Sequence, residues 1–582
     1  MSAERARSYH LSIELETIHP RRKSRLSADR GEPAGRRRWP SGRISAHTAA
    51  AAALAVAGIA LRLVEYGLDR SLWLDEALLS LNLRNRGLGE LLGTLDYTQA
   101  APPGYLVLEK LAVSLFGDSE LALRSVAIAA AVLSVPLFWI VARRILAPWA
   151  AVLALGIFAF TGPLLMHAGE VKPYSSDVFF ATLLLALVLM QWRWGETSIR
   201  RTLVAGLIAA AVVAFSYPAI FVVAGIGATV LVDALLRRDW RVLRPIVAAA
   251  VVGLAGLAAL AVTALDTTSN VRGALEEGSS RFYMPFPPTS RDDLGWFPHA
   301  ASSFFRESLG LWAWAAVLFA GLAIAGAISL ARKEAWRTLA LLLSPLPFLL
   351  AASALERYPI DGRFTLFYVP FAVLLVAEGA WAIGELLGSW MRGGGSRRAR
   401  ASAAAAVACW LAALVGIAAA HAGEYFSTSR GEAIKPALSS LQRDWRPGDT
   451  LYLFYWSQYA FRYYAQCGEC GVAQRTGAPA SLWGSVRLVD PAGSGDSAAL
   501  ASSPPGLVVG IDPEKRSLAA ATAQLDGLDG TGRLWALFTH VRSAEGANEL
   551  AALVRRLDGL GTRLSEQRFD GAVLFLYDLG SD

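Results

Sequence analysis

Two adjacent carboxylates, Asp75 and Glu76, lie where a long apolar run gives way to a polar segment, in the sequence SLWLDEA. A positioned carboxylate can take a proton as a general base, and oxygen ligands of this kind also suit a divalent metal ion. Two acids in a loop are usually only solvated. This pair is of more interest because Trp73 and Leu74 precede it and hold it beside an apolar surface.

Two later segments combine acids, bases and aromatic residues. One reads HAGEVKPYSSD and contains Glu170, Lys172 and Tyr174; the other reads ERYPIDGRF and contains Arg363. Lysine supplies a compact positive charge, and the planar fork of arginine matches a phosphate group. Lys172 and Arg363 are therefore candidates for binding a phosphate, although Arg363 could equally be an interfacial anchor of the helix it begins.

The elements that position these residues are expected to be membrane helices. The chain has 582 residues, of which 54% are hydrophobic and 18% charged, and its mean hydropathy is +0.39. Soluble domains carry more charge, and a run of about 20 apolar residues is the length that spans a bilayer. We expect about eleven transmembrane helices, at residues 46–66, 122–142, 149–167, 176–192, 202–216, 218–236, 245–265, 308–331, 338–354, 365–386 and 402–421.

The basic residues predict the orientation of these helices. Arginine and lysine gather in residues 1–45 and then in every second loop, at 143–144, 193–201, 237–244, 332–337 and 392–400. The positive-inside rule places the N-terminus and these loops in the cytoplasm. The net charge of +7 is then a signal of topology, and no nucleic-acid partner is expected. The high alanine, arginine and glycine content suggests a bacterial protein of the plasma (inner) membrane.

Three parts of the chain follow from this topology. They are a disordered basic cytoplasmic N-terminus (1–45), a transmembrane domain (46–421) with outer loops at 67–121, 167–175, 267–307 and 355–364, and an extracytoplasmic α/β domain (422–582). In the last part, strands are predicted at 450–455, 506–511, 534–540 and 571–577, and helices at 431–443 and 544–557.

Cysteines and buried charges add two further indications. Cys467 and Cys470, in the sequence CGEC, could form a local disulfide or half of a metal site. Away from their outer ends, the predicted spans hold few ionisable residues, chiefly Glu378, with Asp233 and Glu385 near the cytoplasmic ends. Ion-coupled transporters place charges near the midplane, so the charges gathered at the outer ends favour chemistry at the membrane surface.

With these motifs in order, the chain resembles the GT-C superfamily of glycosyltransferases, in particular the family-39 protein O-mannosyltransferases and aminoarabinose transferases. The shared features are the Asp75-Glu76 pair in LDEA, a QxxPPxY run with Gln99 and Tyr105 that leads to FGxSExAxR, the ExKPY run of Glu170, Lys172 and Tyr174, and a late GRFxL that contains Arg363. The resemblance covers about 60–380. The chain departs from the family at Lys172, where arginine is commoner, and at Ala100-Ala101, where some members carry lysine or histidine.

The resemblance implies an inverting transferase that moves a sugar from a polyprenyl-phosphate donor to an acceptor hydroxyl of a lipid, glycan or protein outside the cytoplasm. Asp75 would be the general base, and Lys172 and Arg363 would bind the donor phosphate. The roles of the remaining residues are broader: Glu76 and Glu170 would orient these groups or bind the acceptor, Gln99, Tyr105 and Tyr174 would line the substrate, and His167 would be structural. A divalent metal ion held by Asp75 and Glu76 is the one cofactor that these residues suggest.

Three other functions compete with this interpretation. A membrane polysaccharide polymerase or ligase also uses lipid-linked substrates, but would place its working arginine and histidine residues in a later loop. A transporter or flippase is disfavoured by the apolar midplane. A non-catalytic GT-C relative is disfavoured by the intact acids in both loops.

Overall fold

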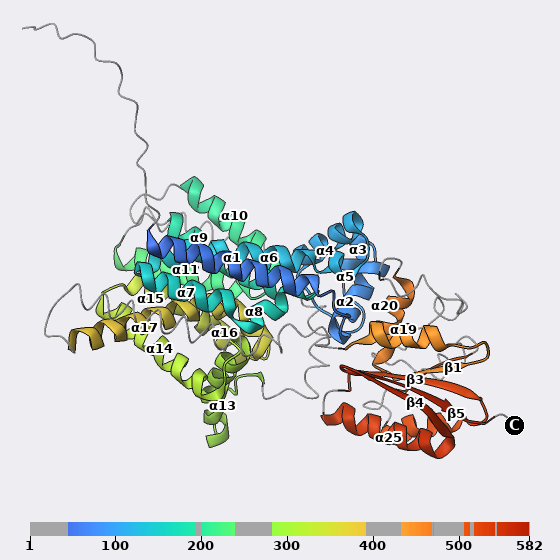
Figure 1. The fold of residues 1–582 in the computed structure, drawn as a ribbon. Coiled ribbons are helices and arrows are strands. Elements are labelled where there is room, and N and C mark those ends of the chain that lie inside the picture. Colours follow the sequence, from blue (N-terminus) through green and yellow to red (C-terminus); the bar gives the residue numbers. More distant parts are fainter. Residues whose placement is uncertain are drawn as a thin grey trace, which may run out of the picture. The chain divides into compact units, whose positions relative to one another are not determined.

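The long apolar runs of the sequence form helices that pack side by side (Figure 1). The structure is a computed structural model that describes residues 45–191, 199–238, 282–390, 432–467, 470, 506–511, 517–541 and 544–580. The chain divides into two units, Met1–Ser45 and Ala46–Asp582. Apart from Ser45, the predicted N-terminal segment lies outside the described residues, and the fold below is that of the second unit.

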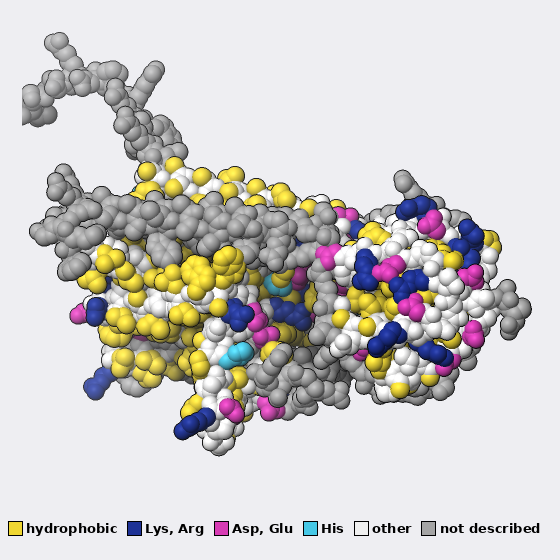
Figure 2. Space-filling view, turned by 60° about the horizontal axis from the view of Figure 1, so that its bottom comes forward, with side chains coloured by type: hydrophobic (Ala, Val, Ile, Leu, Met, Phe, Trp, Pro, Cys, Tyr) yellow, Lys and Arg dark blue, Asp and Glu magenta, His cyan; other side chains and the backbone are white. Residues whose placement is uncertain are grey.

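The apolar helices of this unit confirm a multi-pass membrane protein. They are α1 (Ala46–Gly67), α6 (Ser125–Ile145), α7 (Pro148–Phe160), α8 (Gly162–Met166), α9 (Tyr174–Gln191), α10 (Ile199–Phe215), α11 (Ala219–Leu236), α14 (Ala313–Arg332), α15 (Trp336–Leu343), α16 (Pro345–Ala354) and α17 (Val369–Trp390). Within the described ranges, six segments are long and apolar enough to span a membrane, or seven if α7 and the helix after it form one bent span. Their apolar side chains cover much of the helical part in Figure 2.

The predicted spans coincide with these helices wherever the structure describes the chain. The predicted spans 245–265 and 402–421 lie outside the described residues, so the total of about eleven stays a prediction. One predicted span, 149–167, is broken: α7 and the helical residues Gly162–Gly169 are inclined by 54°. Pro163 explains the break, because proline lacks an N–H and disfavours a helical residue before it.

A buried arginine completes this broken span. Nη1 of Arg62, in α1, donates to the carbonyl oxygens of Gly58 and Ala159, both at 2.9 Å, and Nη2 donates to that of Phe158 at 3.4 Å. The carbonyls at the end of a helix have no partner within it. Arg62 therefore satisfies the end of α7 and stabilises the start of the segment that leads to Glu170.

Helices α14 and α17 approach closely because glycine lies on both sides of their contact. A Cβ atom at Gly326 would lie 2.0 Å from the Leu375 carbonyl oxygen, and one at Gly379 would lie 1.9 Å from that of Leu322. Small residues allow such close packing between membrane helices. The contact fixes the helix that follows Arg363.

The predicted loop 67–121 is largely helical. It contains α2 (Leu74–Asn85), α3 (Leu88–Leu91), α4 (Pro103–Phe116) and α5 (Glu120–Leu123). In the predicted loop 267–307, residues 267–281 lie outside the described part, and α13 (Arg291–Ser303) and the π-helix η3 (Phe304–Ser308) follow. A 3-10 helix, η4 (Gly362–Tyr368), joins the predicted loop 355–364 to α17.

The C-terminal part contains a five-stranded sheet, which confirms the predicted α/β domain. The sheet elements are β1 (Thr450–Leu453), β2 (Leu507–Val509), β3 (Arg533–Thr539), β4 (Thr562–Phe569) and β5 (Ala572–Asp578), in the order β2-β1-β3-β5-β4. β1 pairs in parallel with β2 and β3, and β5 is antiparallel to β3 and β4. One face packs with α19 (Ile434–Asp444) and α20 (Ser457–Gln466), and the other packs with α24 (Leu518–Asp526) and α25 (Ala544–Leu560).

Candidate active site

Asp75 lies in the first turn of α2 and contacts cations from two distant segments. Its Oδ2 is 3.0 Å from Nη1 of Arg363, and its Oδ1 is 3.6 Å from Nζ of Lys172. The Asp75 side chain is 23% exposed. An acid in the first turn also benefits from the positive end of the helix dipole. The structure therefore brings together three of the predicted site residues in a partly open cluster, which we call the Asp75 cluster.

The two cations determine the charge state of Asp75. Burial alone raises the pKa of a carboxyl group, but Lys172 and Arg363, together with a hydrogen bond from Gln99, lower the pKa of Asp75 below its ordinary value. Asp75 is therefore ionised at neutral pH. An ionised carboxylate is the form that accepts a proton.

Arg363 is held by aromatic rings as well as by Asp75. Its guanidinium carbon lies 5.4 Å from the ring centroid of Trp73, 5.8 Å from that of Tyr174 and 5.4 Å from that of Phe364. Such cation–π contacts orient the guanidinium plane. The Arg363 side chain remains 35% exposed, so the guanidinium is both held in place and accessible.

Lys172 is more enclosed, and its ammonium group links two loops. Its side chain is 8% exposed, and Nζ donates to Oε1 of Gln99 at 2.8 Å. Burial lowers the pKa of Lys172, although Asp75 opposes this shift. Gln99 follows Tyr97 and Thr98, whose φ angles of 60° and 52° are rare for residues other than glycine,. The loop is thus fixed in an uncommon conformation beside the Asp75 cluster.

Glu76 points away from Asp75 and has a separate set of partners. Its carboxylate accepts two hydrogen bonds from Arg124, at 3.1 and 2.9 Å, and one from the N–H of Val171 at 2.8 Å. The side chain is 1% exposed, and burial raises the pKa of Glu76 despite the arginine. Its oxygens are therefore occupied within the protein, and this donor set does not fit a metal ion shared with Asp75. Among the described residues, no three His, Cys, Asp or Glu side chains are grouped to hold a metal.

Glu170 is bound to His167, three residues earlier. Oε2 of Glu170 lies 2.6 Å from Nδ1 of His167, and the ring of His167 meets that of Tyr174 edge-on with centroids 5.0 Å apart. Burial opposes the charge of Glu170, but His167 and nearby arginines lower its pKa below the ordinary value. His167 thus lies next to the Asp75 cluster, and its structural role stays a prediction.

Tyr105 is not part of the Asp75 cluster. It is buried in an apolar cluster with Ala77 and Leu106. Glu109, one turn further along α4, is also buried. Burial raises the pKa of Glu109 to about 8, and the Tyr105 hydroxyl beside it opposes this shift. A substrate-lining role for Tyr105 is therefore not supported by its position.

Sequence reasoning missed two aromatic contacts of Arg363. From the sequence alone, Trp73 marks only the membrane surface, and Phe364 is only part of the GRFxL pattern. The close spacing of Trp73 and Asp75 was the sequence feature that could have indicated a shared contact. The Trp73 ring and the Asp75 carboxylate both meet the guanidinium of Arg363.

The comparisons with known proteins give one family match and a set of similar solved structures. A family model described as dolichyl-phosphate-mannose-protein mannosyltransferase matches residues 100–262. No curated protein matches the sequence. Among solved structures, ArnT from Cupriavidus metallidurans bound to undecaprenyl phosphate is similar, with 13% identity, 91% of this chain and 98% of that chain covered, and a TM-score of 0.47. A second similar structure is the oligosaccharyltransferase AglB from Archaeoglobus fulgidus, in complex with an inhibitory peptide and a dolichol-phosphate. Its identity is 12%, the match covers 89% of this chain and 72% of that chain, and the TM-score is 0.49.

The family match includes Tyr105 and the whole ExKPY run, two of the four features that carried the resemblance. The motifs at Asp75 and Arg363 lie outside it, and the structure places them beside Lys172. The predicted resemblance to GT-C membrane glycosyltransferases is thereby confirmed.

Proposed function

We propose that this chain is a membrane glycosyltransferase that moves a sugar from a polyprenyl-phosphate donor to an acceptor hydroxyl of a lipid, glycan or protein. The single observation that carries the proposal is the Asp75 cluster, in which an ionised carboxylate lies 3.0 Å and 3.6 Å from two cations. The family match over residues 100–262 supports the same reaction class.

The reaction uses these groups in one displacement. The acceptor oxygen attacks the anomeric carbon while its proton passes to Asp75, which is a general base. The bond between the anomeric carbon and the phosphate oxygen breaks, and its electron pair stays on the phosphate. Lys172 and Arg363 stabilise the negative charge that develops there. A single displacement inverts the anomeric centre.

The topology completes the proposal. The excess of basic residues in alternate loops supports a cytoplasmic N-terminus and an active site on the extracytoplasmic face. The composition supports a bacterial plasma membrane. In this arrangement the three parts of the chain are 1–45, 46–421 and 422–582, and the donor enters from the surrounding lipid.

The test is sugar release from a panel of polyprenyl-phosphate sugars by the purified protein in nanodiscs, with membrane extract as the acceptor source. We expect one donor to be turned over by the wild type and the rate to fall about 10³-fold in Asp75→Asn. The matched control is Asp96→Asn, which changes an exposed aspartate of the same loop that pairs with Arg86. Equal turnover by Asp75→Asn and wild type would rule out Asp75 as the base. No turnover of any donor by the wild type would favour a polymerase or a non-catalytic relative.

A further inference from the structure

The C-terminal sheet and the helices of the first long loop share one hydrophobic core. Helix α20 packs against α2, and one cluster of buried side chains includes Leu78 and Leu81 of α2, Tyr459 and Phe461 of α20, and Leu451 of β1. A continuous core of this kind transmits displacement, because protein interiors are closely packed. The C-terminal part therefore has a mechanical connection to the helix that begins with Asp75.

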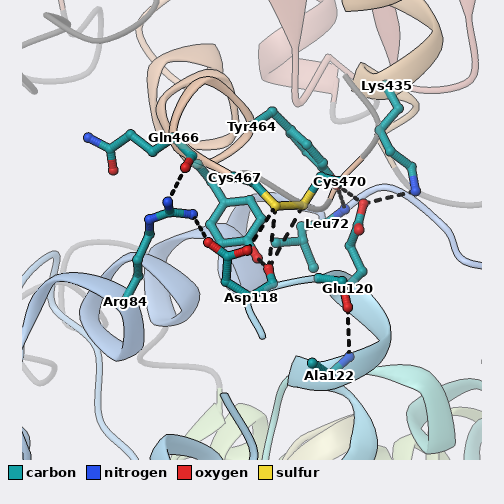
Figure 3. Close-up of a disulfide and its surroundings, with 12 residues drawn as sticks. Leu72, Arg84, Asp118, Glu120, Ala122, Lys435, Tyr464, Gln466, Cys467 and Cys470 are labelled. Atoms are coloured by element: carbon teal, nitrogen blue, oxygen red, sulfur yellow. Dashed lines mark hydrogen bonds and ion pairs between the residues drawn. A yellow bond between two sulfur atoms is a disulfide. The ribbon is translucent and has the colours of Figure 1, made fainter. Parts of the chain in front are cut away.

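Tyr464, in α20, binds the backbone that leads into α2 (Figure 3). Its hydroxyl accepts a hydrogen bond from the N–H of Leu72 at 2.8 Å and donates one to Oε1 of Glu120 at 2.9 Å. Leu72 precedes Asp75 by three residues. Both the Tyr464 and Glu120 side chains are buried, so water does not compete for these bonds.

Lys435, in α19, holds the same short segment from a second position. Its N–H donates to Oγ of Ser71 at 3.2 Å, and its Nζ donates to the carbonyl oxygen of Asp69 at 2.7 Å. Nζ also lies 2.8 Å from Oε1 of Glu120. On the membrane-helix side, Arg124 donates to the carbonyl oxygen of Arg70 at 2.7 Å. Residues 69–72 are thus fixed between the two parts of the chain.

The end of α20 is fastened to the same loop. Cys467 and Cys470 form a disulfide, and Sγ of Cys467 lies 3.5 Å from the carbonyl oxygen of Asp118. Arg84 of α2 pairs with the Asp118 carboxylate and donates to the carbonyl of Gln466, as Figure 3 shows. The disulfide therefore links the end of α20 to Cys470 at the point where α20 contacts the loop between α4 and α5.

A second contact reaches the loop that carries Gln99. The rings of Tyr97 and Tyr459 meet edge-on with centroids 5.4 Å apart. Tyr97 and Thr98 have positive φ angles, a conformation that persists only where surrounding structure imposes it. Packing against α20 supplies such a constraint two residues before Gln99, which accepts the hydrogen bond from Lys172.

We propose that the C-terminal sheet part is a positioning component of the active site, acting through Tyr464 and Lys435 on the entry to α2. Neither residue touches Asp75; they fix the backbone that sets where its carboxylate lies. The inference rests on the proposed function for its catalytic consequence, whereas the mechanical coupling is independent of it. Displacing a reacting group by about 1 Å can lower a rate about 100-fold, so partial loosening is expected to cost about tenfold.

The test compares Tyr464→Phe with Tyr452→Phe in the full-length protein in nanodiscs. The first substitution removes the hydroxyl that binds Leu72 and keeps the ring. The second removes another buried hydroxyl of the C-terminal part, on the opposite face of the sheet, that has no hydrogen-bond partner among the described residues. Hydrogen exchange of peptides that cover 69–80 is the first measurement, and kcat and KM for the donor are the second.

We expect about tenfold faster exchange over 69–80 in Tyr464→Phe and a kcat about tenfold lower with KM within twofold, while Tyr452→Phe matches the wild type. Lys435→Met is a second variant that loosens the same segment and is expected to act in the same direction. Equal exchange in both tyrosine variants would overturn the inference, as would faster exchange with unchanged kcat. If the wild type turns over no donor but exchange still accelerates in Tyr464→Phe, the coupling stands and the proposed function fails.

Discussion

The charged side chains at the two ends of the membrane helices are paired in different ways. At the end away from Asp75, Glu378 of α17 accepts hydrogen bonds from Lys333 at 2.5 Å and Ser329 at 2.7 Å. Glu378 is buried, so this is a closed pair in which one cation and one hydroxyl satisfy the acid. Asp233 of α11, at the same end, meets two arginines, Arg337 at 2.9 Å and Arg237 at 3.1 Å. In the Asp75 cluster, one carboxylate faces two cations, at 3.0 and 3.6 Å.

The difference separates a structural role from a functional one. A closed ion pair has little capacity left for a ligand, and its loss is expected to appear mainly in stability. The Asp75 cluster and the Asp233 group each carry one more positive than negative charge and remain partly open. In the Asp75 cluster, the arginine also contacts three aromatic rings. An excess cation beside an ionised base is suited to a substrate that carries a phosphate and delivers a proton.

After the loss of Asp75 itself, the largest effect is expected from removing a cation of the Asp75 cluster. Arg363→Met is expected to lower kcat about 100-fold, since loss of one group that stabilises developing charge costs about 10²–10³ in rate. Arg337→Met makes the same substitution at an ion-paired arginine of the opposite end, and it is expected to change kcat less than about threefold. The measurement is donor turnover by the two variants. Similar losses of kcat in both would contradict a special role for the Asp75 cluster.

The pair of Glu76 and Arg124 is closed although it adjoins the Asp75 cluster, so its loss is expected to lower stability. Glu76→Gln leaves a buried arginine without its counter-charge, which typically costs about 3 kcal/mol or more. Thermal unfolding in detergent is the measurement. The double variant Glu76→Gln with Arg124→Met is expected to recover part of the loss. A double variant that is less stable than the single one would show that unpaired charge is not the cause.

The burial of Lys172 is expected to appear in the pH dependence of the reaction. Because burial lowers the pKa of Lys172, its charge is lost as the pH rises through a value below about 10.4, that of an exposed lysine. The rate should therefore fall on the alkaline side, while Asp75, whose pKa is lowered, stays ionised down to acidic pH. Arginine keeps its charge to about pH 12.5, so Lys172→Arg should abolish the alkaline decrease in kcat/KM. A decrease that is unchanged in this variant would assign it to another group.

The sequence predicted the members of the Asp75 cluster better than their geometry. Asp75, Lys172 and Arg363 were selected from motif order, and the structure brings them together from segments far apart in the chain. The divergence of Asp75 and Glu76 was missed because α2 was not recognised as a helix. Adjacent residues of a helix point about 100° apart, so one acid meets the exposed cations and the other meets buried Arg124.

In the C-terminal part, the sequence predicted the apolar strands and missed the strand that has no apolar pattern. The four predicted strands coincide with β1, β2, β3 and β5. The edge strand β4, with the sequence TRLSEQRF, has no buried residue and so no apolar pattern to detect. Helix α20 was also missed, because its tyrosines form bonds with the first loop that no local pattern reveals.

The smallest effect is expected at Glu378, although it is a buried acid in a predicted membrane span. Glu378→Gln retains a side chain that can accept the hydrogen bond from Ser329. Lys333 is about half exposed, so water can solvate its ammonium group when the ion pair is lost,. Because Glu378 lies 15 residues beyond Arg363, about 22 Å along a helix, kcat and KM are expected to stay within twofold of the wild type. A large loss of turnover without a change in thermal stability would give the opposite end a catalytic or transport role. That result would favour a transporter over the transferase.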